Sequence, residues 1–110
     1  MDIDLTEAKQ IYDYLDYVIF KDGRVYNKKR RRFKKPVNNT DYPYMSLPRK
    51  GKNKHFKLHL LVSDHFIKPR EYRLENDLVV NHKDLNKHNP HVDNLELVTR
   101  RENALHWINM

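Results

Sequence analysis

The sequence predicts an α+β fold in which a small antiparallel β-rich N-terminal part precedes a strand–loop–strand–helix module. Short β-rich runs separated by turn residues occupy residues 17–58. Apolar residues at helical spacing follow at 59–67. A polar loop between two short strands then ends on a helix-start signal at 99–102. The chain of 110 residues suits one domain or a small pair of lobes.

The first quarter of the chain predicts a short helix and a hairpin. Asp4 and Glu7 have the spacing of a capping box, which predicts a helix over residues 6–15. The runs 17–20 and 24–27 are rich in β-forming residues and flank an Asp-Gly pair. This pair favours a tight turn, so the two runs are expected to form antiparallel strands.

A basic segment continues the β-rich part. Residues 28–35, KKRRRFKK, fit either a strand or a loop that faces phosphates. Residues 42–48 alternate as a further strand, 49–54 form a charged turn, and the extended pattern resumes at 55–58. The whole span 17–58 is therefore expected to be one small antiparallel sheet with basic turns and one basic face.

The middle of the chain predicts a helix that ends at a proline. The apolar spacing at 59–67 is helical, and Pro69 stops the helix. The segment from there to residue 77 is expected to be a connector. The chain thus divides into a basic β-rich part at 1–58, a helix and connector at 59–77, and the C-terminal module at 78–110.

The C-terminal module has the order strand, polar loop, strand, helix. The apolar residues 78–80 predict a short buried strand, and 91–98 predict a second one. Thr99 and Glu102 have the spacing of a capping box, with Thr99 as the N-cap. The last helix is therefore expected to run from about residue 100 towards 108.

Positive charge is concentrated in one part of the chain. Residues 21–57 hold fourteen Lys/Arg against two acidic residues, a net charge of +12, whereas the rest holds eight basic and thirteen acidic residues, a net charge of −5. Such polarity favours a polyanionic partner, and nucleic acid is the preferred interpretation over a solubilising surface. A basic β-ribbon can enter the major groove of DNA. The residues predicted to bind DNA are Lys28, Lys29, Arg30, Arg31, Arg32, Lys34, Lys35, Arg49, Lys50, Lys52 and Lys54.

Composition excludes several kinds of site. The chain has no cysteine, so it cannot form disulfides, thiolate zinc sites or cysteine nucleophiles. No apolar run is long enough to cross a membrane. The acidic N-terminus lacks the apolar stretch of a signal peptide, so we interpret the protein as intracellular.

Three polar residues of the module are candidates for metal-assisted chemistry. His82 can act as a general base because imidazole titrates near neutrality. Asn81 and Asn103 offer amide oxygens, which are hard ligands suited to Mg²⁺. The order of elements is expected to bring these three side chains together. Asn94 is expected to bond the loop backbone and hold the shape of the hairpin.

The segment VNHKDLNKHNPHVDNLELVTRREN resembles the ββα-metal core of phage-type HNH homing endonucleases. The shared pattern is Asn-His, a polar loop with asparagines, Asn-Leu-Glu-x-Val-Thr, and Glu-Asn. Upstream, HLLVSDHF is similar to that family's His-x-Leu-Val-x-x-x-Phe segment. The β-rich lead-in resembles the DNA-binding part that often precedes the core. The resemblance covers roughly residues 17–106 and is specific over 79–103.

This resemblance implies an endonuclease that hydrolyses phosphodiester bonds of double-stranded DNA in the cytoplasm of a bacterial or phage-infected cell. It implies His82 as the base that activates water, and Asn81 and Asn103 as ligands of one divalent ion, Mg²⁺ or Mn²⁺. It implies Asn94 as the structural asparagine of the hairpin. The 1–58 part would then bind DNA, and 78–110 would be the nuclease core.

Two further residues and two alternatives accompany this interpretation. Asp84 and His106 are candidates for supporting the site from outside the ligand set, or for contacting phosphate. Some family members have Asp at the place of Asn81, and a glycine at the place of Leu85.

The alternatives are a DNA-binding protein that keeps the fold with little or no cleavage, and a ribonuclease. The retained His82 favours the nuclease.

Overall fold

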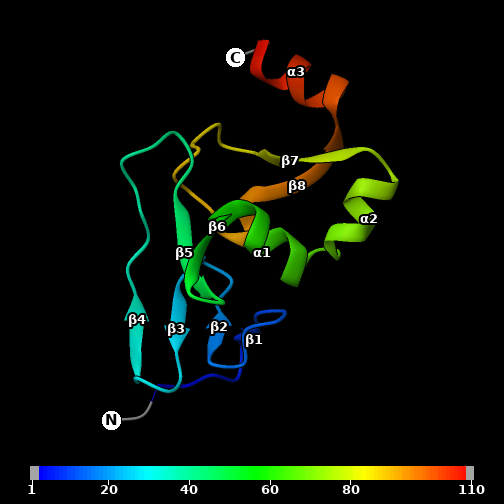
Figure 1. The fold of residues 1–110 in the computed structure, drawn as a ribbon. Coiled ribbons are helices and arrows are strands. Elements are labelled where there is room, and N and C mark those ends of the chain that lie inside the picture. The colour runs from blue at the N-terminus through cyan, green and yellow to red at the C-terminus, as the bar shows by residue number, and fades with distance from the viewer. Residues whose placement is uncertain (1–2, 109–110) are drawn as a thin grey trace.

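The computed structural model describes residues 3–108 and has the predicted α+β class (Figure 1). Short antiparallel strands and three α-helices follow one another within these residues. In chain order the elements are β1 (Lys9–Gln10), β2 (Tyr17–Ile19), β3 (Val25–Asn27), β4 (Arg32–Lys34), β5 (Tyr44–Arg49), β6 (Lys52–Lys57), α1 (Leu58–Phe66), α2 (Arg70–Glu75), β7 (Leu78–His82), the 3₁₀ helix η1 (Val92–Asn94), β8 (Leu95–Thr99) and α3 (Arg100–Ile108).

The molecule is elongated, with extents of 45 × 27 × 27 Å. The sheet β1-β2-β3-β4 lies at one end, β5–β6 and α1 lie in the middle, and β7–β8 with α3 form the other end (Figure 1). Within the described part of the chain, no helix combines the length and the apolar character that crossing a bilayer requires. Those helices instead pack on short strands.

The β-rich half contains two sheets where one was predicted. β4 pairs with β3, whereas β5 pairs with β6 in a separate sheet. The connector between β4 and β5 includes Pro36 and Pro43, and Val37 forms an isolated bridge with Tyr44. Because proline has no N–H to donate, this connector cannot continue a ladder of strand hydrogen bonds. The expectation of a single sheet over 17–58 is therefore wrong, although its hairpins at 17–27 and 44–57 are present.

The helix predicted for residues 6–15 is also wrong. Lys9 and Gln10 pair with β2, and the backbone N–H of Ile11 donates to the Tyr17 carbonyl at 3.1 Å. Asp13 has φ of +69°, which a right-handed helix does not accommodate. Ile11 is buried at 1% exposure, so burial against the sheet outweighs the local helical preference.

The central helix α1 confirms the helix predicted from apolar spacing. It buries Leu58, Leu61 and Val62 against the core, which also receives Met45 and Leu47 from β5. The predicted connector after it is wrong in one respect, because it contains α2. Pro69 lacks a backbone N–H, so α1 cannot continue through it. At the start of α2 the missing N–H is harmless, because the first N–H groups of a helix have no partner within the helix.

The C-terminal module follows the predicted order with one change. The strand expected at 91–98 begins with η1, and β8 starts at Leu95. The capping box is confirmed: the Thr99 N–H donates to Glu102 Oε1 at 3.2 Å, and the Glu102 N–H donates to Thr99 Oγ1 at 3.1 Å. These reciprocal bonds satisfy two donors at the start of α3.

The first sheet is docked onto the polar loop between β7 and β8. The Val92 N–H donates to the Lys21 carbonyl at 2.8 Å. Gly23, in the turn after β2, has φ of +95°, and a Cβ added there would lie 2.8 Å from Cγ of Pro90. Glycine is thus required both by the conformation of the turn and by its close approach to the loop.

We predict that Gly23→Ala lowers the free energy of unfolding more than Gly51→Ala does. Both glycines have positive φ, so each alanine carries a conformational cost of about 1–2 kcal/mol. A Cβ at Gly51 meets no atom within 4 Å, whereas one at Gly23 collides with Pro90. Urea unfolding of both variants measures the difference. Equal losses would contradict the docking of this turn on the loop.

Candidate active site

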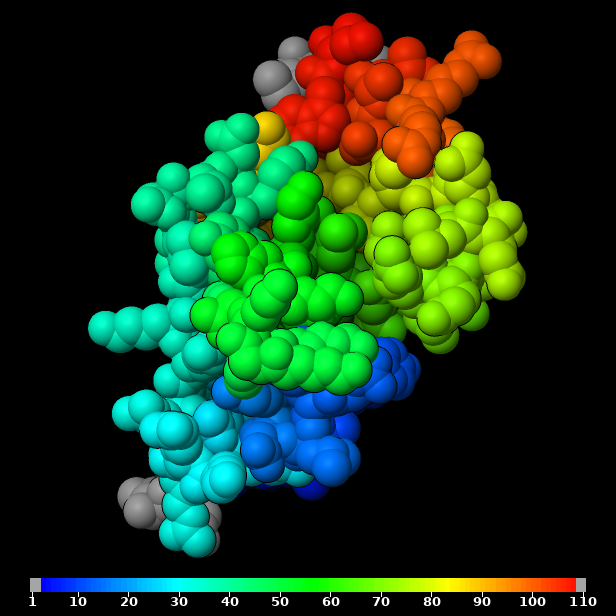
Figure 2. Space-filling model, in the orientation of Figure 1, coloured from blue at the N-terminus to red at the C-terminus, as the bar shows by residue number. Residues whose placement is uncertain are grey.

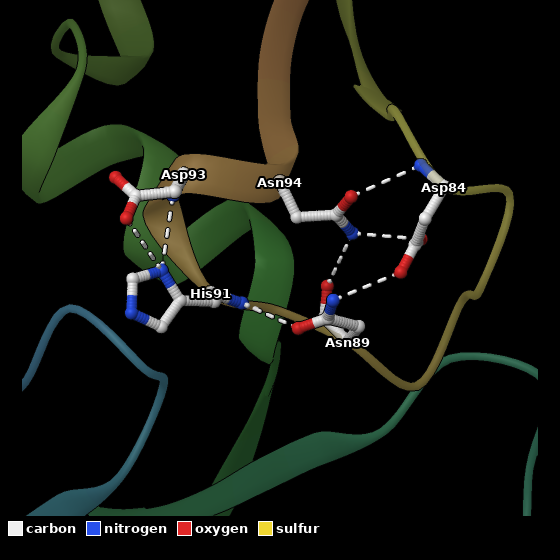
Figure 3. Close-up of polar contacts among 5 residues, drawn as sticks. All are labelled: Asp84, Asn89, His91, Asp93 and Asn94. Atoms are coloured by element: carbon white, nitrogen blue, oxygen red, sulfur yellow. Dashed lines mark hydrogen bonds and ion pairs between the residues drawn. The ribbon is translucent and has the colours of Figure 1, made fainter.

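Hydrogen bonds of Asn94 close the polar loop that follows β7 (Figure 3). Asn94 Oδ1 accepts from the Asp84 N–H at 3.0 Å, and Nδ2 donates to Asp84 Oδ1 at 2.9 Å and to the Asn89 carbonyl at 3.0 Å. The Lys83 N–H donates to the Asn94 carbonyl at 2.8 Å. Asn94 is 9% exposed, so these bonds are shielded from water and hold both ends of the loop.

Asp84 braces the same loop from its outer side. Its Oδ1 accepts from the Asn86 N–H at 2.8 Å. Its Oδ2 accepts from Asn89 Nδ2 at 2.9 Å (Figure 3). The bond from Asn89 is the main cause that holds the pKa of Asp84 below its ordinary value. Leu85 has φ of +64°, the left-handed conformation that favours glycine. The loop thus takes a tight path that Asp84 secures.

Asn81 is oriented by the carboxylate directly opposite it in the β7–β8 hairpin. Its Nδ2 donates to Glu96 Oε1 at 2.8 Å, and the two residues are partners in the strand register. A carboxylate can only accept hydrogen bonds, so the amide must direct its nitrogen at Glu96. Asn81 Oδ1 is buried and has no hydrogen-bond donor within the described residues. Glu96 therefore leaves an amide oxygen free to bind a cation.

His82 lies in a cluster of three aromatic rings. Its ring centre is 4.8 Å from that of His59 and 5.8 Å from that of Tyr42, and the latter two are 4.8 Å apart. His82 is 1% exposed, and its Nε2 is buried without a hydrogen-bond partner among the described residues. Burial lowers the pKa of His82, against an opposing effect of Asp84. The imidazole is consequently neutral near pH 7 and able to accept a proton.

The helix α3 contacts both strands of the hairpin and brings two more polar groups to it. Asn103 Oδ1 and His106 Nε2 are both buried, and neither has a hydrogen-bond partner in the part of the chain described. Oxygen acceptors that lack donors suit a hard divalent cation. Across residues 3–108, no three His, Cys, Asp or Glu side chains gather so as to hold a metal ion. Asn81 Oδ1 and Asn103 Oδ1 are the two buried amide oxygens without a donor among the described residues.

Residues 72–105 match the HNH endonuclease family. The chain carries an HNH endonuclease domain. The match begins within α2 and ends within α3, so it includes the whole β7–β8 hairpin and its loop. Asn81, His82, Asp84, Asn94, Glu96 and Asn103 therefore lie inside the HNH domain, whereas Tyr42, His59 and His106 lie outside the matched residues.

Relatives extend the similarity beyond this domain. The chain is 37% identical over 97 residues to an uncharacterised HNH endonuclease of Acanthamoeba polyphaga mimivirus, covering 87% of this chain and 24% of the relative. It is 32% identical over 102 residues to the H-N-H endonuclease F-TflII of Escherichia phage T5, covering 92% of this chain and 52% of the relative. The chain thus spans about a quarter to a half of the length of these relatives.

A solved structure has the same fold. The HNH homing endonuclease I-HmuI, in a structure that describes its binding and cleavage of DNA, is matched with a TM-score of 0.80 and 34% identity. The match covers 94% of this chain and 59% of that chain. In sequence, DNA endonuclease I-HmuI of Bacillus phage SP01 is 36% identical over 89 residues. The likeness includes the N-terminal sheets as well as the HNH domain.

Sequence reasoning missed three side chains that surround the predicted residues. Glu96 orients Asn81, while His59 and Tyr42 pack on His82. Burial is the main cause that lowers the pKa of His59 to about 3, and the charge of His82 is the second cause. The glutamate of the Asn-Leu-Glu pattern was a signal for Glu96, but its partner depends on the hairpin register. No sequence signal pointed to Tyr42, because the connector that carries it has no periodic pattern.

The predicted DNA-binding residues lie on or beside two hairpin turns. In the β3–β4 turn, Asn27 Oδ1 accepts from the N–H groups of Lys29 and Arg30, at 3.0 Å each. In the β5–β6 turn, Lys50 and Gly51 both have positive φ. Of the eleven predicted residues, ten are exposed and Lys34 is half-buried. Their charges are therefore available to a polyanion.

We predict that the protein loses stability in acid through its buried histidines. Burial lowers the pKa of His59, His65 and His82 from the ordinary 6.5, so each stays neutral in the folded state. The unfolded chain takes up protons below about pH 6.5, which favours unfolding. The stabilisation is complete above that pH and declines as pH falls towards the pKa values that these histidines have in the folded state.

Urea unfolding measured between about pH 8 and pH 5 tests this expectation. The His59→Phe variant keeps an aromatic ring and removes the group with the largest resolved shift, so its stability should depend less on pH. A free energy of unfolding that does not fall below pH 6.5 would contradict the burial of neutral imidazoles.

Proposed function

We propose that the HNH domain hydrolyses phosphodiester bonds of double-stranded DNA with one divalent ion, Mg²⁺ or Mn²⁺. In this proposal His82 is the general base, and Asn81 and Asn103 are the metal ligands. The observation that supports it best is the set of buried acceptor atoms without donors at the hairpin and α3. Burying such atoms without a partner costs free energy, so they favour a cation in their neighbourhood.

His82 has the properties of a general base. Its buried Nε2 lacks a hydrogen-bond partner among the described residues, and its lowered pKa keeps it unprotonated at neutral pH. In the proposed reaction Nε2 takes the proton of the attacking water. The rings of Tyr42 and His59 restrict the imidazole to one orientation, and thereby hold the accepting atom in place.

Asn81 and Asn103 are suited to hold the ion through neutral oxygens. A divalent ion supplies charge stabilisation to the phosphate and to the leaving 3′ oxygen. The hydrogen bond to Glu96 directs Asn81 Nδ2 towards the Glu96 carboxylate and Asn81 Oδ1 away from it. Asn81 Oδ1 thus stays available to bind the ion. Neutral ligands hold a cation more weakly than carboxylates, so activity is expected to depend on the concentration of the ion.

The basic turns are proposed to hold the duplex. Lys28–Arg32 and Arg49–Lys52 place exposed charges at the ends of two hairpins, and such charges bind DNA phosphates by releasing counterions. The solved structure of I-HmuI, which is similar in fold, concerns DNA binding and cleavage. This likeness supports DNA as the substrate in preference to RNA.

We predict that the protein nicks or linearises supercoiled plasmid with Mg²⁺ or Mn²⁺ and that chelator stops the reaction. His82→Ala should abolish cleavage, by at least about 10²-fold, and leave DNA binding intact because the imidazole is buried. His88→Ala is the matched control, since His88 lies in the same loop and is exposed. Cleavage by His82→Ala at the parent rate would overturn the assignment of the base. Binding without any cleavage by the parent would favour a DNA-binding protein.

We further predict that Asn81→Asp binds the ion more tightly and is less stable without it. The new carboxylate would face Glu96, which now accepts a hydrogen bond from Asn81 at 2.8 Å, and the two negative charges would repel. Added Mn²⁺ should raise the melting temperature of this variant more than that of the parent. The half-maximal ion concentration for cleavage should fall.

The double variant Asn81→Asp, Glu96→Gln is the matched control for repulsion. Glutamine can donate to the new carboxylate, so stability in chelator should return while tighter ion binding remains. An unchanged half-maximal ion concentration in both variants would mean that residue 81 is not a ligand.

A further inference from the structure

Lys87 is held between two aromatic rings at the edge of the site. Its Nζ lies 5.2 Å from the ring centre of Tyr42, in the β4–β5 connector, and 5.5 Å from that of Trp107, near the end of α3. The connector, the loop after β7 and the end of α3 thus meet at one edge of the molecule (Figure 2). A cation between two rings gives up freedom of movement and keeps its charge in one place.

This ammonium lies close to the proposed base. Tyr42, whose ring carries Lys87 on one side, is also 5.8 Å from the ring of His82. Lys87 and His82 thus lie beside the same aromatic ring. The neighbouring Lys83 is exposed, whereas Lys87 is half-buried between Tyr42 and Trp107.

Among the described residues, Lys87 has no anionic partner. Within residues 3–108 no carboxylate oxygen lies within 4.0 Å of its Nζ, and Nζ donates no hydrogen bond there. The residue is half-buried, so its charge is less screened than that of a surface lysine. A half-buried ammonium without a partner favours an anionic ligand.

We propose that Lys87 binds the phosphate that is cut, by donating a hydrogen bond from Nζ to a non-bridging oxygen beside His82. This inference rests on the proposed nuclease function and adds a substrate contact to it. The base and both proposed metal ligands are neutral, so the ammonium of Lys87 can offset charge that develops on the phosphate. Lys57 Nζ also lies near the Tyr42 ring, at 5.3 Å, but Lys57 is exposed whereas Lys87 is half-buried. Lysine acts on phosphate as a point charge and needs no bidentate geometry. The two rings fix its position before DNA arrives.

Three variants separate charge from packing. Lys87→Met removes the charge and keeps a long side chain whose sulfur packs well on aromatic rings. Lys87→Arg keeps both the charge and the stacking on the rings. Lys83→Met removes a charge from the same loop at an exposed position. Melting temperatures of the three variants should stay close to that of the parent. Changes in cleavage rate can then be attributed to the change in charge.

Two measurements test the contact. In chelator, the slope of log Kd against log salt for a duplex should decrease by about one for Lys87→Met, because one phosphate contact is lost. With Mn²⁺, the single-turnover rate of plasmid cleavage should fall by about 10²-fold for Lys87→Met. Lys87→Arg should restore most of the rate, and Lys83→Met should cut at the parent rate.

Each outcome decides the proposal. An unchanged salt slope for Lys87→Met overturns the phosphate contact. A reduced salt slope with an unchanged cleavage rate means that Lys87 contacts a phosphate other than the one cut. This outcome also overturns the proposal. If the parent binds DNA but never cuts, the nuclease function fails, whereas the slope still reports whether Lys87 contacts phosphate. A reduced slope together with the slower rate, restored by Lys87→Arg, supports the proposal.

Discussion

Two hydrogen bonds between the Asn94 side chain and Asp84 close the polar loop that separates β7 from β8. The loop contains many backbone polar groups, and a carboxamide satisfies several of them at once because it both donates and accepts. Closing the loop in this way determines the register of the two strands. The register in turn places Glu96 opposite Asn81 and Leu95 opposite His82. The orientation of the candidate ligand therefore depends on a pair of residues that need not touch the metal or the substrate.

The site that results is built largely from neutral polar groups in a buried setting. Asn81 and His82 are almost fully buried, and burial disfavours charge on the imidazole. Charged side chains lie around these groups. They include Glu96, which accepts a hydrogen bond from Asn81, and Lys87, which lies between two rings. Such an arrangement leaves acceptor atoms without donors, a costly state for the protein alone. A divalent ion and a phosphate would compensate that cost, so the same groups that reduce stability favour binding.

The N-terminal sheets take part in the site as well as carrying the basic turns. The first sheet docks on the polar loop through the Lys21 carbonyl and through Gly23 against Pro90. The β4–β5 connector brings Tyr42 to His82 from the other part of the chain. The half that carries the basic turns and the HNH domain thus form one packed structure. The match to I-HmuI, which spans 94% of this chain, includes both halves.

The sequence by itself determined the elements whose signals are local. The Asp-Gly hairpin, the apolar spacing of α1 and the capping box of α3 each involve residues within a few positions of one another, and all three are present. The sequence of residues 79–103 also showed the resemblance to HNH endonucleases. Only the tertiary structure decided that residues 6–15 pair with β2, that Glu96 faces Asn81, and that Tyr42 and His59 enclose His82. These contacts join residues far apart in the chain, where burial and strand register outweigh any local preference.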